Sequence, residues 1–135
     1  FDTLYPLTRC GLGGAIAGGR QFMSWNHEQD FLRAIQWLIS HDELSGPVNL
    51  AAPNPIPQSE FMQSLRRASG TRLGLTATAW MLEIGTFLMR TESELIMKSR
   101  RVVPDRLLQS GFNFDYPEWG PAAIELCRRR RSGKQ

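Results

Sequence analysis

A chain of 135 residues with 41% hydrophobic and 10% aromatic residues can build one apolar core and is not intrinsically disordered. Its formal net charge of +3 comes from residues 128–131 and Lys134 at the C-terminal end, because the rest of the chain has 11 basic and 13 acidic groups. The body of the chain therefore lacks the basic face of a nucleic-acid-binding protein.

The number of cysteines indicates the cellular compartment, and the first residue indicates whether the sequence is a fragment. Cys10 and Cys127 are too few for a disulfide framework, so we expect free thiols in a reducing compartment and a cytoplasmic location. No secretory signal is visible, and the chain begins with Phe1 instead of Met. We therefore expect a truncated piece of a longer protein.

The clearest secondary-structure signals lie between residues 18 and 50. Residues 20–25 are predicted to form a strand, and Asn26 is predicted to cap a helix, with Gln29 at the capping-box position. After a turn at 45–47, residues 48–50 are predicted as a second strand, so the pattern indicates a parallel crossover in an α/β fold. The helix carries an apolar stripe made of Phe31, Ala34, Ile35, Leu38 and Ile39.

A glycine-rich stretch precedes this unit. The letters GLGGAI invite comparison with a dinucleotide-binding fingerprint, but Ile16 occupies the position of its third glycine and no apolar strand comes before it. A plain loop is the favoured interpretation, and a phosphate cradle the weaker alternative.

The next predicted helix covers residues 59–69, with Gly70 as its C-cap. Arg66 and Arg67 are predicted to point outward, and they fit a solvated face better than an anion site. The inward residues are predicted to be Phe61, Met62, Leu65 and Ala68.

Beyond Gly70 the chain becomes strongly apolar. Residues 77–89 are too short for a membrane span of ~20 residues, so we expect them to be buried or to meet a partner. A helix is predicted over 91–97 and a brief strand over 100–103. Pro104 is then predicted to open a short helix that ends at Gly111.

The C-terminal part combines an alternating segment, a helix and a basic tail. Residues 112–116 alternate like a half-buried strand, and 118–128 are predicted to be the last helix. Residues 128–135 are predicted to be a disordered, solvated tail, a reading favoured over contact with RNA or acidic lipid.

Three sequence blocks resemble one family. They read GRQFMSWNHEQDF, SGPVNLAAPNPIPQSEFMQSL and RRVVPDRLLQSGFNFDYP, and they resemble the extended short-chain dehydrogenase/reductases, in particular the C-terminal half of the nucleoside-diphosphate-sugar epimerase branch. The resemblance runs from about residue 5 to about residue 126. It implies that residues 1–70 complete a Rossmann-type NAD(P)-binding domain. Residues 71–127 would then form a small, mainly helical substrate-side domain with short strands.

The resemblance also implies an activity for the longer protein, namely an NAD(P)-dependent epimerase, dehydratase or reductase. The family's Tyr-x-x-x-Lys pair is absent here, because the only tyrosines are Tyr5 and Tyr116 and the only lysines are Lys98 and Lys134. We therefore expect no catalysis and no bound NAD(P) in this chain alone. Its expected partners are a missing N-terminal Rossmann half and an unknown small-molecule substrate, and a homo-oligomer is also compatible with the sequence. The alternative is a non-catalytic, nucleotide-responsive binding or scaffold module.

The resemblance also implies that Arg20, Gln21 and Trp25 face the substrate side. His27 is a further candidate because it lies at a helix start, and Asn54 because it lies in the loop that leaves a predicted parallel strand, although as a turn-former it needs no function. His27 could contact a ligand or donate a proton, but helix capping and packing beside Trp25 are favoured, because no nucleophile or second metal ligand lies at useful spacing. Asp30 is assigned only to the helix dipole. Met23 stands where sugar-nucleotide members typically place a phosphate-holding arginine, which counts against a nucleotide-sugar substrate.

Overall fold

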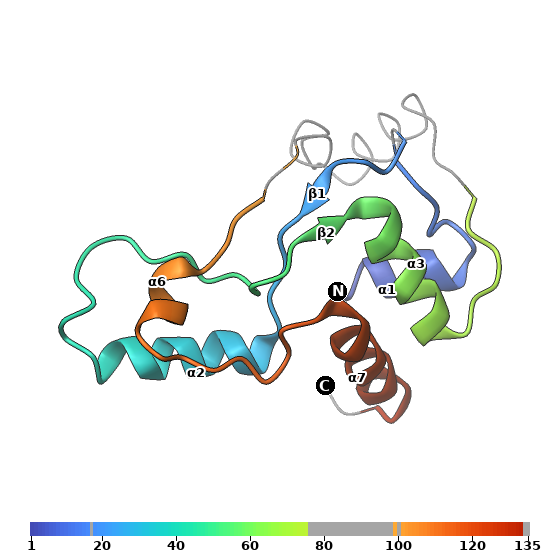
Figure 1. The fold of residues 1–135 in the computed structure, drawn as a ribbon. Coiled ribbons are helices and arrows are strands. Elements are labelled where there is room, and N and C mark those ends of the chain that lie inside the picture. Colours follow the sequence, from blue (N-terminus) through green and yellow to red (C-terminus); the bar gives the residue numbers. More distant parts are fainter. Residues whose placement is uncertain (17, 76–98, 100, 134–135) are drawn as a thin grey trace.

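The computed structural model describes residues 1–16, 18–75, 99 and 101–133 (Figure 1). The fold class is α/β, as predicted, with two short strands among helices. The elements are α1 (Leu4–Arg9), β1 (Phe22–Met23), α2 (Glu28–Ile39), β2 (Ile56–Pro57), α3 (Gln58–Ser69), α6 (Asp105–Gln109) and α7 (Trp119–Arg131). The predictions for residues 77–89 and 91–97 lie outside the described residues.

The two observed strands are not the pair that the sequence predicts. β1 and β2 are antiparallel, with Phe22 opposite Pro57 and Met23 opposite Ile56. Further backbone bonds join the two segments, from the amide of Ala52 to the carbonyl of Trp25 at 2.7 Å and from the amide of Gln58 to the carbonyl of Gln21 at 2.9 Å. The predicted parallel crossover is therefore wrong, and residues 48–50 form no strand. Prolines at positions 53, 55 and 57 contribute no N–H donors, which keeps the ladder short.

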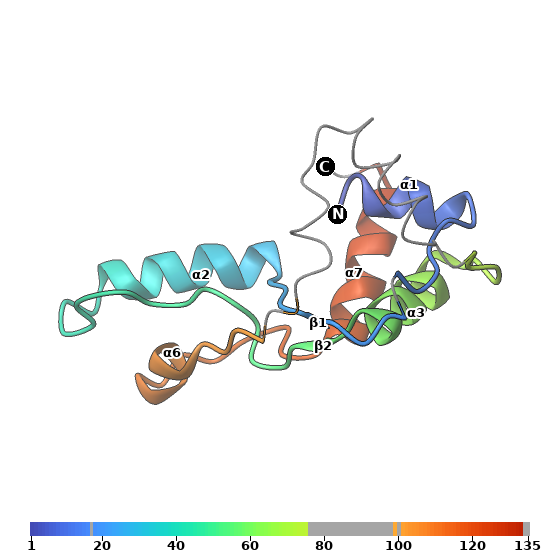
Figure 2. The same ribbon diagram turned by 90° about the horizontal axis from the view of Figure 1, so that it is seen from above.

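Apolar side chains gather in two separate cores. The larger core lies between α3, α7 and the strands, and α1 packs against it. The smaller core lies between α2 and α6. Both views show α2 and α6 on one side of the molecule and α1, α3 and α7 on the other (Figures 1 and 2). The larger core comprises Trp25, Ala52, Phe61, Met62, Leu65, Trp119, Ala122, Ala123 and Cys127, and the smaller one Ala34, Leu107 and Phe112.

Helix α3 matches its prediction closely. Gly70 ends it in the left-handed conformation at φ 75°, which glycine adopts without strain. Phe61 stacks on Trp119 at 3.9 Å between ring centroids, and the Trp119 indole N–H donates to the Phe61 carbonyl at 2.9 Å. One detail differs, because Arg66 is half-buried instead of pointing fully outward.

Helix α2 begins one residue later than predicted. His27 is its N-cap, and the His27 Nδ1 atom accepts a hydrogen bond from the Gln29 amide at 3.2 Å. The prediction of Asn26 as the cap is therefore wrong; its side-chain amide instead donates to the Leu50 carbonyl at 3.4 Å. The apolar stripe also faces the core only in part, since Ala34 is buried whereas Ile39 is 75% exposed.

The segments around α6 keep their predicted burial but not their predicted strands. Phe112 is buried and Phe114 is half-buried, while Asn113 and Asp115 between them are exposed. The alternation is thus present without a backbone ladder, and residues 101–103 form no strand either. Pro104 caps α6 from outside the helix instead of opening it.

The basic run at the C-terminal end is helical, so the prediction of disorder is wrong for residues 128–131. Arg129 forms an ion pair with Glu28, and Arg130 forms one with Asp2. The Arg131 guanidinium donates to the Ala68 carbonyl at 2.7 Å. Helix α7 thus extends about one turn past its predicted end, and three contacts with other parts of the chain hold that turn in place. Among the described helices, none combines the length and the apolar character that crossing a bilayer needs.

Candidate functional site

The five predicted substrate-side residues do not converge on one cavity. Trp25 and Asn54 form one contact, His27 forms a second with α7, and Gln21 a third with the glycine-rich stretch. Arg20 is exposed and pairs with no carboxylate in the described part of the chain.

Trp25 and Asn54 join the proline-rich loop to the start of α7. The Trp25 indole N–H donates to the Asn54 carbonyl at 3.0 Å, and the Trp25 ring meets Trp119 edge-on at 5.2 Å. The Asn54 side-chain amide donates to the Pro117 carbonyl at 3.2 Å and to a Glu118 carboxylate oxygen at 2.9 Å. Asn54 is itself exposed, so its side chain fixes the loop at the molecular surface.

His27 is almost fully buried and uses both ring nitrogens. Nδ1 accepts the Gln29 amide, so it carries no proton, and the proton of the neutral ring lies on Nε2. Nε2 then donates to the Glu125 carboxylate of α7 at 3.0 Å, and the ring stacks on Tyr116 with centroids 3.9 Å apart. The capping interpretation is confirmed, and the aromatic ring that stacks on His27 is that of Tyr116.

Asp30 plays a part that sequence reasoning missed. Its carboxylate is fully buried and accepts the backbone amides of Asp115 and Tyr116, each at 2.8 Å. Arg33 adds a third bond, at 3.0 Å to Oδ1. The signal was the spacing of His27 and Asp30, three residues apart on one turn of helix, because both side chains reach toward the segment that leads into α7.

The glycine-rich stretch is bonded to α3. The Gln58 side chain accepts the Ile16 amide at 3.0 Å and donates to the Gly14 carbonyl at 3.4 Å, and Arg66 donates to the Gly13 carbonyl. Of the backbone groups in these bonds, only the Ile16 N–H is a donor that a phosphate could use, and the Gln58 side chain occupies it. Residues 11–15 form neither helix nor strand, as the plain-loop interpretation predicts.

Gln21 and Gly19 extend the same contact. The Gln21 side-chain amide donates to the Ile16 backbone carbonyl at 3.1 Å. The backbone carbonyl of Gln21 accepts the backbone N–H of Gln58 at 2.9 Å. Gly19 has a φ of 66°, and a Cβ there would lie 2.8 Å from Ser59. Only glycine allows this close approach of the loop to α3.

Metal ligands do not gather anywhere in the described ranges, since no three His, Cys, Asp or Glu side chains there come together. The two thiols are unpaired, with Cys10 exposed and Cys127 buried. The geometry thus contains structural ties among α2, α7 and the loops, and no assembled nucleophile or metal centre within that part of the chain.

Comparisons with known proteins relate the chain to one family. Residues 77–126 match a family described as "Domain of unknown function (DUF1731)". The chain is 37% identical over 119 residues to epimerase family protein Mb2239 from Mycobacterium bovis, covering 87% of this chain and 38% of that protein. It is 32% identical over 120 residues to epimerase family protein YfhF from Bacillus subtilis, covering 89% and 39%.

A solved structure shows the same fold. The crystal structure of human epimerase family protein SDR39U1 (isoform 2) with NADPH matches with a TM-score of 0.83 and 26% identity, covering 94% of this chain and 42% of that chain. The fold and these relatives place the chain among the epimerase family proteins. It corresponds to their C-terminal part, so the resemblance inferred from the sequence is confirmed. The chain spans about two fifths of the length of the curated relatives it matches.

Proposed function

We propose that this chain is the C-terminal, substrate-side part of an NAD(P)-dependent epimerase or oxidoreductase and is not catalytic by itself. The observation that carries the proposal is the match to a human relative solved with NADPH, of which this chain covers 42%. The sequence also lacks a Tyr-x-x-x-Lys pair. Cofactor binding and proton transfer are accordingly assigned to an N-terminal Rossmann part, and residues 1–70 and 71–127 to the two predicted units.

An exposed apolar surface on α2 supports the proposal that this chain packs against a separate N-terminal part. Phe31, Leu32, Ile35 and Ile39 lie within an arc of about 100° at 3.6 residues per turn, and we call this set the α2 apolar arc. Leu32 is 59% exposed and Ile39 75%. Because α6 covers a different side of the helix, through Ala34, the arc is free to pack against the N-terminal part of a longer protein.

The predicted substrate-side residues remain part of the proposal, but only one of them is proposed to contact the substrate directly. Arg20 has an exposed guanidinium and is proposed to face the substrate directly. Gln21, Trp25, His27 and Asn54 are proposed to shape the wall beside it, since their polar groups hold neighbouring segments. The two unpaired thiols support a reducing compartment, for which we propose the cytoplasm.

The test compares two proteins. One is the 135-residue chain, and the other is the same chain preceded by the N-terminal part of the Mycobacterium bovis relative. NADPH binding is followed by nucleotide fluorescence, and oxidation of NADPH by its absorbance with candidate carbonyl and sugar-nucleotide substrates. We expect the fusion to bind NADPH and the chain alone not to bind it.

A matched pair of variants examines the α2 apolar arc in the fusion. Leu32→Glu places a charge in the arc and is expected to lower both NADPH affinity and melting temperature. Gln36→Glu introduces the same charge at an exposed position outside the arc and serves as the control. Tight NADPH binding by the 135-residue chain would contradict the proposal, as would equal effects of the two variants. NADPH binding without turnover of any substrate would favour the scaffold alternative.

A further inference from the structure

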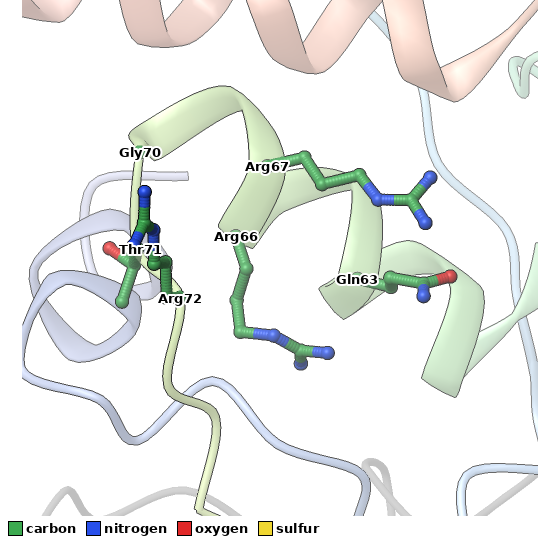
Figure 3. A pocket seen from close by; sticks show the side chains of 6 residues that line it. All are labelled: Gln63, Arg66, Arg67, Gly70, Thr71 and Arg72. Atoms are coloured by element: carbon green, nitrogen blue, oxygen red, sulfur yellow. The ribbon is translucent and has the colours of Figure 1, made fainter.

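We propose that the end of α3 and the segment after it form a binding site for a small phosphate ester. A cavity of about 500 Å³ lies there, and we call it the arginine cavity (Figure 3). A volume of this size suits a small molecule. The cavity is lined by Gln63, Arg66, Arg67, Gly70, Thr71 and Arg72.

The charge of the arginine cavity is positive and uncompensated. Its lining residues include three arginines and neither an aspartate nor a glutamate. Elsewhere in the described part of the chain, Arg33, Arg129 and Arg130 each pair with an aspartate or glutamate, whereas Arg66, Arg67 and Arg72 form no such pair. The C-terminal end of α3 carries a partial negative charge of only about half an elementary charge, so the three full positive charges dominate.

Arg66 is held in position before any ligand arrives. Its guanidinium donates one N–H to the Gly13 carbonyl. A guanidinium has five N–H donors, so four are left for a ligand. A Cβ on Gly74 would lie 2.7 Å from the Arg66 Cδ atom, so glycine at that position leaves room for the arginine stem. A planar guanidinium fixed in this way suits bidentate contact with phosphate oxygens.

A second cavity adjoins the first and extends the positive surface. It measures about 430 Å³, shares Gly70, Thr71 and Arg72 with the arginine cavity, and adds Arg9 on its other side. Arg72 therefore borders both cavities. Neither lining includes an aromatic side chain on which a base could stack, so the contacts favour a phosphate or diphosphate group over single-stranded nucleic acid.

The test titrates inorganic pyrophosphate into the 135-residue chain by calorimetry at low ionic strength. We expect Arg72→Gln to weaken binding by about tenfold or more, since it removes a charged donor that borders both cavities. Arg67→Gln is expected to act in the same direction. Neither substitution touches the bond between Arg66 and Gly13, so circular dichroism should show unchanged helix content.

The control is Arg128→Gln, which removes the same charge from an exposed arginine on α7. Affinity in this variant is expected to stay within about twofold of the original, because Arg128 lines neither cavity. No binding of pyrophosphate at millimolar concentration would overturn the inference. An equal loss in Arg128→Gln and Arg72→Gln would overturn it as well, by showing only general attraction of anions. NADPH plays no part in the experiment, so its outcome is independent of the proposed function.

Discussion

Cys127 and Cys10 place identical thiols in opposite surroundings. Cys127 is fully buried in the larger core, and desolvation raises the pKa of its thiol above the ordinary value of 9.0, while the charge of Arg131 acts in the other direction. Cys10 is exposed at the end of α1. Thiol reactivity requires the thiolate and access to it, so the two residues should differ sharply.

We therefore expect a thiol reagent at pH 8 to label Cys10 rapidly and Cys127 only after unfolding.

The pH dependence of the free energy of unfolding follows from the raised pKa of Cys127. The unfolded thiol ionises near its ordinary pKa while the folded thiol stays protonated, so the contribution of Cys127 is present below pH 9 and is lost as the pH rises further. Denaturant unfolding at pH 8 and pH 10 measures this. Cys127→Ala should reduce the decline, Cys10→Ala should not, and equal labelling of both thiols in the folded chain would contradict the expectation.

At the scale of elements, the Asp30 carboxylate holds the start of α2 against the segment that leads into α7. Asp30 accepts two backbone amides from the segment before α7, and His27 on the same turn reaches Glu125 within α7. These contacts span 85 to 98 positions of sequence. They anchor the first turn of α2, beyond which the helix packs on α6.

We expect Asp30→Ala to lower the free energy of unfolding by about 2–4 kcal/mol, because two amide donors lose their acceptor and Arg33 loses a partner. Glu28→Gln is the matched control, on the same turn of the helix. Glu28 is 61% exposed while its partner Arg129 is 25% exposed, so a change of less than about 1 kcal/mol is expected. Urea denaturation followed by circular dichroism measures both, and similar values for the two variants would count against the assigned role of Asp30.

The sequence predicts α3 and α7 well, because their apolar spacing and their boundaries at Gly70 and Pro117 are local features. It fails at the strands, since the pairing of Phe22 with Pro57 depends on a partner 35 positions away and on prolines that shorten the ladder. It also fails at Asp30, whose bonding partners lie near position 115. Of the candidate site, the capping role of His27 was foreseeable from its place at a helix start; the arginine cavity was not, because it needs three dimensions.

At the scale of the whole molecule, the two cores differ in size. Among the described residues, the larger one buries nine around α3 and α7, and the smaller one buries three around α2 and α6. Local opening is easier where fewer apolar side chains are buried. The molecule should therefore have one firmly packed half and one that opens more readily.

Hydrogen exchange of the 135-residue chain tests this difference. Amides in the middle of α3 and α7 are expected to exchange more slowly than those of α2, and α6 should exchange fastest because it is a single short helix. Covering the α2 apolar arc, as in the fusion with the N-terminal part, should slow exchange in α2 selectively. Equal protection of α2 and α7 in the isolated chain would show that the cores do not act separately.

The ion pair between Arg130 and Asp2 brings residue 2 beside the last turn of α7. Two regions at opposite limits of the printed sequence are thus neighbours in space, and the order in which the helices are connected matters less than their packing. A circular permutant that joins these regions through a short flexible linker and starts at the exposed turn near Gly46 should keep both cores, since it breaks no buried contact.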